Sequence, residues 1–230
     1  MQDVAHYRLR WLILVFTLYA HINLHASEIS TQPWQKLSEE DGISIFYRED
    51  TIPGKHWIRG VVTDSVRIDV VGQVLLDVAS YPKWMEQLRE SRIVQAQSPS
   101  DYILYNYYDL PWPLWDRDIY VHVVIQRDTV HHIVTANIDK YDSPKFPPIP
   151  KVIRVPAMQG SLKLESLSPQ VTRGEFTELL DMGGTIPEWA KTYLSKQTPA
   201  YILSKVREAC MDSFYIRSAP RCSSISKGCP

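Results

Sequence analysis

The sequence predicts an α+β protein in which a curved antiparallel sheet is covered by one long C-terminal helix, an arrangement that could enclose a cavity. Between residues 43 and 180 the chain consists mainly of short β-rich segments separated by turn residues. After Pro187 apolar residues recur at helical spacing. An antiparallel sheet with one buried face needs a cover, and this last segment is long and amphipathic enough to supply it.

The first 26 residues have the pattern of a secretory signal peptide. Arg8 and Arg10 precede an apolar run that begins at Trp11, and Ala26 is a small residue before a polar stretch. The run of about ten residues is shorter than the ~20 needed to span a bilayer. We therefore expect cleavage near Ala26 and export to the periplasm or the exterior. An uncleaved anchor is the alternative.

The next segments predict a helix, a hairpin and a helical pair. Pro33 is expected to start a short helix that carries Trp34 and Leu37. Residues 43–47 and 57–62 alternate between apolar and polar side chains, as the two strands of a hairpin do.

The helical pair is expected to follow the hairpin. Residues 70–76 have helical spacing, with Asp69 as a cap. Tyr81-Pro82 interrupts this helix, and residues 84–88 form a second short helical piece.

A long series of strands should follow. The β-rich segments are residues 92–97, 103–108, 119–126, 130–138, 152–155, 161–167 and 171–180. Between the fourth and fifth lies a Pro-rich loop from Ser143 to Pro150, which cannot join a ladder. Pro187 and Pro199 each mark a helix start near the end of the chain. The second helix should carry one apolar side, formed by Ile202, Leu203, Val206, Cys210 and Phe214.

Composition favours one domain and argues against several partners. The chain has 230 residues, 44% of them hydrophobic, and a formal net charge of -1. We assign residues 27–217 to a single domain and residues 218–230 to a cysteine-containing tail. Without a basic run, a nucleic-acid partner is not expected. Cys210, Cys222 and Cys229 have no metal-ligand spacing, but in an oxidising compartment Cys222–Cys229 or Cys210–Cys222 could pair.

Four ordered motifs resemble the START (steroidogenic-acute-regulatory-related lipid transfer) domain family. They span roughly residues 34–215 and therefore cover nearly all of the mature chain. They are Trp34-x-x-Leu37 with Gly42-Ile43-x-Ile45-x-Tyr47-Arg48, then Tyr81-Pro82-x-Trp84-Met85, then residues 111–118 (PWPLWDRD), and finally residues 181–189 (DMGGTIPEW).

This resemblance implies a helix-grip fold whose hydrophobic tunnel binds one lipid without catalysis, cofactor or metal. The ligand would be a phospholipid, a sterol or a fatty acyl compound. We expect a monomer that touches membranes transiently to load and unload. An exposed Phe146 in the Pro-rich loop could make that contact, although the same side chain could equally pack onto the core.

The candidate ligand-binding residues lie on two strands and the C-terminal helices. They are Tyr105, Tyr107, Val121, Val123, Ile125, Trp189, Tyr193, Ile202 and Val206. Residues 121, 123 and 125 share one face of a strand, but the pattern does not fix which tyrosines face the tunnel. As aligned, sterol- and phosphatidylcholine-binding relatives place an arginine at position 123 or 125. Its absence here predicts a tunnel that relies on apolar contact.

Arg117-Asp118 allows two interpretations. The pair could meet a lipid headgroup, or it could lock an irregular strand entry. In the second case Arg117 would bond turn carbonyls and Asp118 would accept from backbone N–H groups. The position at a Pro-rich corner favours the structural role.

Two other function classes remain open. Helix-grip relatives include aromatase/cyclases that fold polyketide chains, and for such an enzyme His122, Arg173 and Glu175 would be the candidate residues. A protein-interaction module that uses the tail cysteines would instead have a filled core and no cavity.

Overall fold

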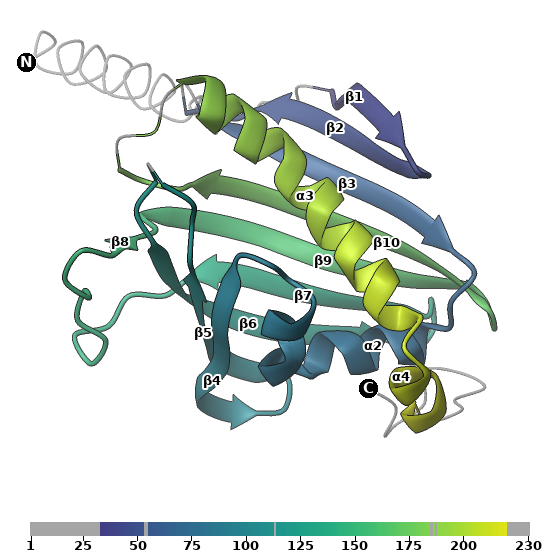
Figure 1. Cartoon of the computed structure of the whole chain (residues 1–230). Coiled ribbons are helices and arrows are strands. Elements are labelled where there is room, and N and C mark those ends of the chain that lie inside the picture. Colours follow the sequence, from purple (N-terminus) through teal and green to yellow (C-terminus); the bar gives the residue numbers. More distant parts are fainter. Residues whose placement is uncertain (1–32, 53–54, 113, 185, 187, 220–230) are drawn as a thin grey trace, which may run out of the picture.

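The computed structural model describes residues 33–52, 55–112, 114–184, 186 and 188–219, and for residues 188–196 the backbone only. One ten-stranded sheet bends around a long helix, α3 (Glu188–Cys210), as Figure 1 shows. The strand order is β1-β2-β3-β10-β9-β7-β6-β5-β4, and β8 pairs with β6. All pairs are antiparallel except β6 with β8. The predicted fold class is confirmed.

The strands cover most of the predicted segments. Their bounds are β1 Gln35–Glu40, β2 Ile43–Glu49, β3 His56–Asp64, β4 Leu88–Ser98, β5 Asp101–Tyr108, β6 Arg117–Asp128, β7 Ile133–Lys140, β8 Ile153–Arg154, β9 Ala157–Ser168 and β10 Val171–Asp181. The other helices are α2 Ile68–Leu76, the 3-10 helix η1 Val78–Lys83 and α4 Ser213–Ser218. Among the described residues, no helix is long and apolar enough to cross a membrane.

Helix α3 packs directly on the backbone of β3 at Gly60. A Cβ at Gly60 would stand 2.7 Å from a Leu203 methyl carbon and 3.1 Å from the Pro199 Cβ. Arg207 fixes the same half of the helix, because its Nε donates to the Asp64 carboxylate at 3.0 Å and its Nη1 donates to the Asp41 carbonyl at 2.7 Å. The helix is therefore seated on β3 without an intervening side chain.

The predicted helix at Trp34 and Leu37 is wrong, because this segment is the edge strand β1. Gln35 pairs with Tyr47 of β2, so the segment satisfies its backbone groups at the sheet edge. Trp34 packs against the guanidinium groups of Arg48 and Arg59, 4.7 and 4.3 Å from its ring centre. Local spacing predicted a helix, but the segment instead pairs with the edge of β2 as a strand.

Asp69 does not cap α2. Arg67 occupies the N-cap position without a side-chain capping bond, and Asp69 lies in the first turn. There its carboxylate accepts from Arg67 Nε at 2.9 Å and from the Val70 backbone N–H at 3.1 Å. The expected second helical piece also lies earlier than predicted, in η1, and Leu88 already begins β4.

The C-terminal helix is continuous where two helices were predicted. Pro199 lies inside α3, although a proline in a helix interior removes one hydrogen bond. Its ring is fully buried against the sheet, which offsets that loss. Phe214 belongs to α4 and is 59% exposed. Asp212 caps α4 by accepting from the Phe214 backbone N–H at 2.8 Å.

Three sequence predictions concern residues outside the described part of the chain. These are the signal peptide of residues 1–26, the helix start at Pro187, and the pairing of Cys222 and Cys229. Within the described part of the chain, Cys210 is a free, buried thiol.

Candidate functional site

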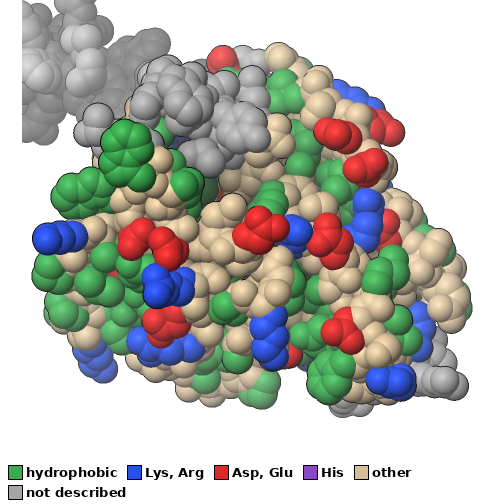
Figure 2. Space-filling view, viewed as in Figure 1, with side chains coloured by type: hydrophobic (Ala, Val, Ile, Leu, Met, Phe, Trp, Pro, Cys, Tyr) green, Lys and Arg blue, Asp and Glu red, His purple; other side chains and the backbone are tan. Residues whose placement is uncertain are grey.

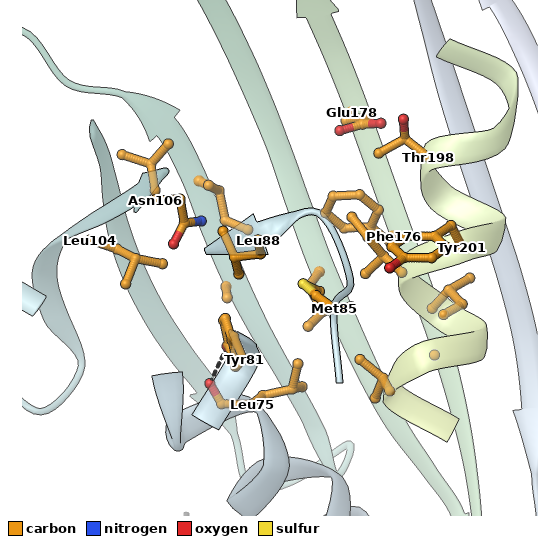
Figure 3. Close-up of a pocket in the computed structure, with 18 of the residues that line it drawn as sticks. Leu75, Tyr81, Met85, Leu88, Leu104, Asn106, Phe176, Glu178, Thr198 and Tyr201 are labelled. Atoms are coloured by element: carbon orange, nitrogen blue, oxygen red, sulfur yellow. Dashed lines mark hydrogen bonds between the residues drawn. The ribbon is translucent and has the colours of Figure 1, made fainter. Parts of the chain in front are cut away.

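A cavity of about 630 Å³ lies between the concave face of the sheet and α3. Side chains from α2, η1, β5, β6, β7, β9, β10 and α3 line it, together with the loop between β5 and β6. Figure 3 shows Leu104 and Asn106 entering from β5 and Phe176 and Glu178 from β10. Tyr201 of α3 completes this part of the wall. A cavity of this size suits a small-molecule ligand.

The predicted apolar face of β6 forms part of this wall. Val121, Val123 and Ile125 all line the cavity, because alternate residues of a strand share a face. Ile202 and Val206 of α3 line it from the opposite side. That these residues bind a ligand stays a prediction. Trp189 and Tyr193 belong to the residues for which the structure describes only the backbone.

The choice of Tyr105 and Tyr107 as cavity residues is wrong. The other face of β5 lines the cavity, through Tyr102, Leu104, Asn106 and Tyr108. Tyr105 packs on Tyr120 with ring centres 4.6 Å apart, and the Tyr107 hydroxyl donates to Asp116 at 2.5 Å. Two faces of β5 are apolar, and the pattern alone could not choose between them.

The Pro-rich loop explains why the outer face of β5 is also buried. Phe146 stacks on Tyr120 with ring centres 4.3 Å apart and planes 11° apart. It also contacts Tyr141 edge-on at 6.4 Å. Of the two alternatives for Phe146, the structure therefore shows packing onto the core.

Arg117 and Asp118 are both buried, at 1% and 0% exposure. Arg117 donates to the Trp115 carbonyl, as the structural interpretation expects. The expected partners of Asp118 are wrong, because its two carboxylate oxygens accept from Arg154 Nε and Nη2 at 2.7 and 2.8 Å. This bidentate pair fixes β8 and the end of the Pro-rich loop to the start of β6. Asp118 therefore has a structural role, whereas Arg117 also borders the cavity.

The cavity wall contains polar atoms without partners. Within the described part of the chain, four wall residues have a buried side-chain atom with no hydrogen bond: Trp84 Nε1, Asn106 Oδ1, Arg117 Nε and Glu178 Oε1. Glu178 is 4% exposed, and burial raises the pKa of its carboxyl to about 8. Burial also raises the pKa of Tyr108 to about 12, with a smaller contribution from the charge of Glu178.

The candidate residues for an enzyme do not converge on this cavity. His122 lies on the other face of β6, where its Nε2 is 2.7 Å from Asp101. Glu175 faces Arg59 at 3.7 Å, and Arg173 is exposed. None of the three lines the cavity. No cluster of three potential metal-ligating side chains occurs among the residues described.

Glu178 is the polar wall residue that sequence reasoning missed. It lies between Phe176 and Leu180 on the face of β10 that alternation assigns to the interior. A charged residue at an interior position of an otherwise apolar strand face was the sequence signal that could have identified it.

A family model and several known proteins match most of this chain. A family model described as START domain matches residues 22–213. Phosphatidylcholine transfer protein from Bos taurus is 24% identical over 197 residues, which cover 82% of this chain and 89% of that protein. The protein of the same name from Rattus norvegicus is 26% identical over 187 residues, covering 78% of this chain and 84% of that protein.

A solved structure, the STAR-related lipid transfer protein from Xanthomonas axonopodis, has a TM-score of 0.68 at 22% identity, covering 78% of this chain and 99% of that one. Human StAR-related lipid transfer protein 5 has a TM-score of 0.67 at 17% identity, covering 91% and 98%. These structures confirm the helix-grip fold.

Proposed function

Because the chain belongs to the START domain family, we propose that it binds one lipid in its internal cavity and carries it without chemical change. The observation that carries this proposal is the cavity of about 630 Å³ with a mainly aliphatic and aromatic wall. The relatives named as lipid transfer proteins support it. Burial of an acyl chain contributes about 0.8 kcal/mol per CH₂, so a chain of ~16 carbons supplies roughly 13 kcal/mol before entropic costs. One charge-assisted polar contact contributes only about 1.5–3 kcal/mol.

Native mass spectrometry of the protein purified from its own host tests this proposal. We expect one lipid retained per chain, identified after organic extraction. A protein that arrives without lipid, and takes none from vesicles of host lipid, would contradict it.

We further propose that the loop between β5 and β6 touches the membrane during loading. Trp112 and Trp115 of this loop are 92% and 59% exposed. Leu110 and Leu114 of the same loop line the cavity, so the loop connects the outer surface to the interior. Tryptophan is enriched at membrane–water interfaces because its ring is apolar and its N–H is polar. This loop replaces Phe146 as the proposed contact.

Electrostatic attraction contributes little to this proposed contact. Figure 2 shows acidic and basic side chains interspersed over the face that carries α3. The formal net charge is also only -1. We therefore expect apolar insertion of the loop to dominate over attraction to anionic lipid.

The double variant Trp112→Ser/Trp115→Ser tests the membrane contact. We expect vesicle-to-vesicle lipid transfer to fall roughly tenfold, because two interfacial anchors are lost. Bound lipid and thermal midpoint should stay unchanged. Val130→Ser is the matched control, since Val130 is 78% exposed in the turn between β6 and β7. Equal transfer by both variants would disprove the contact.

Export remains a proposal that rests on the first 26 residues. A basic start, a short apolar run and a small residue at position 26 support it. N-terminal sequencing of the protein from fractionated host cells should find a chain that begins at Ser27 outside the cytoplasm. An intact Met1 in the membrane fraction would indicate the uncleaved anchor instead.

A further inference from the structure

Glu178 is a buried carboxyl that faces the cavity. It is 4% exposed, and its neighbours on the same face of β10 are the apolar Phe176 and Leu180. Among the described residues no ion pair involves it, and its Oε1 has no hydrogen bond. In Figure 3 its carboxyl points toward the space beside Thr198 of α3. Buried polar groups are almost always hydrogen-bonded, so an unpartnered one in a cavity wall points to a partner from outside the chain.

Gly160, the residue of β9 opposite Glu178, has no side chain that could pack against it. This residue of β9 is the register partner of Glu178 and lies on the same face of the sheet. A Cβ at Gly160 would lie 3.5 Å from the Glu178 Cβ and only 2.6 Å from the Thr177 carbonyl oxygen. The backbone therefore excludes a side chain at this position, so β9 places none against Glu178 here.

A second unpartnered atom lies across the cavity on β5. Asn106 Nδ2 donates to the Tyr108 hydroxyl at 3.4 Å, which leaves Asn106 Oδ1 buried without a bond. Tyr108 in turn lies within electrostatic range of Glu178. Asn106, Tyr108 and Glu178 therefore line the same cavity, although β5 and β10 are not neighbours in the sheet.

Building on the proposed lipid-binding function, we propose that Glu178 and Asn106 bind the polar end of the ligand, and that this end is an uncharged hydroxyl or amide. Asn106 Oδ1 can only accept, so the ligand must supply a donor. A buried, uncharged carboxyl donates its proton, so the ligand must also supply an acceptor. Hydroxyl and amide groups offer both. A phosphodiester only accepts, and a quaternary ammonium has no N–H to donate.

Lipid uptake from vesicles of dioleoylphosphatidylcholine that contain dioleoylglycerol and C18 ceramide tests this assignment. The first two lipids share their acyl chains and differ in the head group. We expect the wild type to take up the glycerol and ceramide lipids in preference to phosphatidylcholine. Glu178→Met should lower that uptake roughly tenfold, which corresponds to one lost hydrogen bond, and so reduce the preference over phosphatidylcholine.

Glu178→Gln and Phe176→Leu are the matched controls. Glutamine keeps a donor and an acceptor at the same position, so we expect uptake within about threefold of wild type. Phe176→Leu changes the neighbouring wall without touching a polar group and should affect all three lipids alike. Circular dichroism checks that each variant is folded.

The outcomes separate this inference from the proposed function. A wild type that prefers phosphatidylcholine, or a Glu178→Met variant with unchanged selectivity, overturns the inference and leaves lipid binding intact. A wild type that takes up none of the three lipids overturns both.

Discussion

Asp118 and Glu178 are both buried carboxyls, but they differ in whether their oxygens have hydrogen-bond partners. Asp118 is fully buried and receives two hydrogen bonds from Arg154. Glu178 is nearly as buried, has an oxygen without a partner, and faces the cavity. A satisfied buried charge joins parts of a fold, whereas an unsatisfied one destabilises it. Asp118 therefore has a structural role, whereas Glu178 is the residue that we propose binds the ligand.

The largest effect should come from breaking the satisfied pair. Asp118→Asn leaves the Arg154 guanidinium partly buried without its counter-charge, and we expect the free energy of unfolding to fall by about 3–5 kcal/mol. Urea denaturation measures this change.

The double variant Asp118→Asn/Arg154→Met is the control for that pair. It should lose less than the sum of the two single variants, because the pair acts as a unit. Additive losses would show that Asp118 and Arg154 are not coupled.

A smaller and opposite effect is expected at Glu178. Its pKa is raised from 4.5 to about 8 in the folded protein, so the folded state holds a proton that the unfolded state has released. The stability contribution of this group is therefore fully present below pH 4.5 and is lost as the pH rises toward and through 8. Glu178→Gln removes this titration.

The measurement is the free energy of unfolding of both proteins across pH. The advantage of Glu178→Gln over wild type should grow by about 2 kcal/mol between pH 6 and pH 8. Tyr108, the titratable group that faces the carboxyl, has a pKa raised to about 12 and stays neutral throughout this range. Parallel pH curves would mean that the carboxyl is solvated or paired.

The smallest effect should come from a half-exposed carboxyl. Asp101 is 33% exposed and lies 2.7 Å from His122, which is 36% exposed. Pairs of this kind contribute less than about 1 kcal/mol. Asp101→Asn should therefore shift the urea midpoint only slightly, and lipid uptake should not change. A loss of stability as large as that of Asp118→Asn would contradict the expectation that removing a carboxylate costs more stability the more deeply it is buried.

Local patterns predicted the strands well because alternation is a property of neighbouring residues. The valine face of β6 and the second half of α3 follow directly from spacing. The partner of Asp118 did not, since Arg154 lies 36 residues further along the chain. The tyrosine choice failed for a related reason. Phe146 packs on the cluster that Tyr105 forms with Tyr120 of β6, and this contact comes from a distant loop.

The cavity's polar groups depend on curvature, which a linear pattern does not contain. Asn106 and Glu178 come from strands that are not neighbours, and only the bend of the sheet makes them face a common space. The edge strand β1 and the unbroken helix α3 likewise reflect tertiary packing that overrode local preference.

Gly60 gives the cavity its height without belonging to its wall. Leu203 and Pro199 rest directly on this glycine, so the distance between α3 and the sheet is set by a residue with no side chain. We therefore expect an added methyl group at Gly60 to push α3 away from the sheet and to change the volume of the cavity as a whole, whereas a substitution in the wall changes only one part of it.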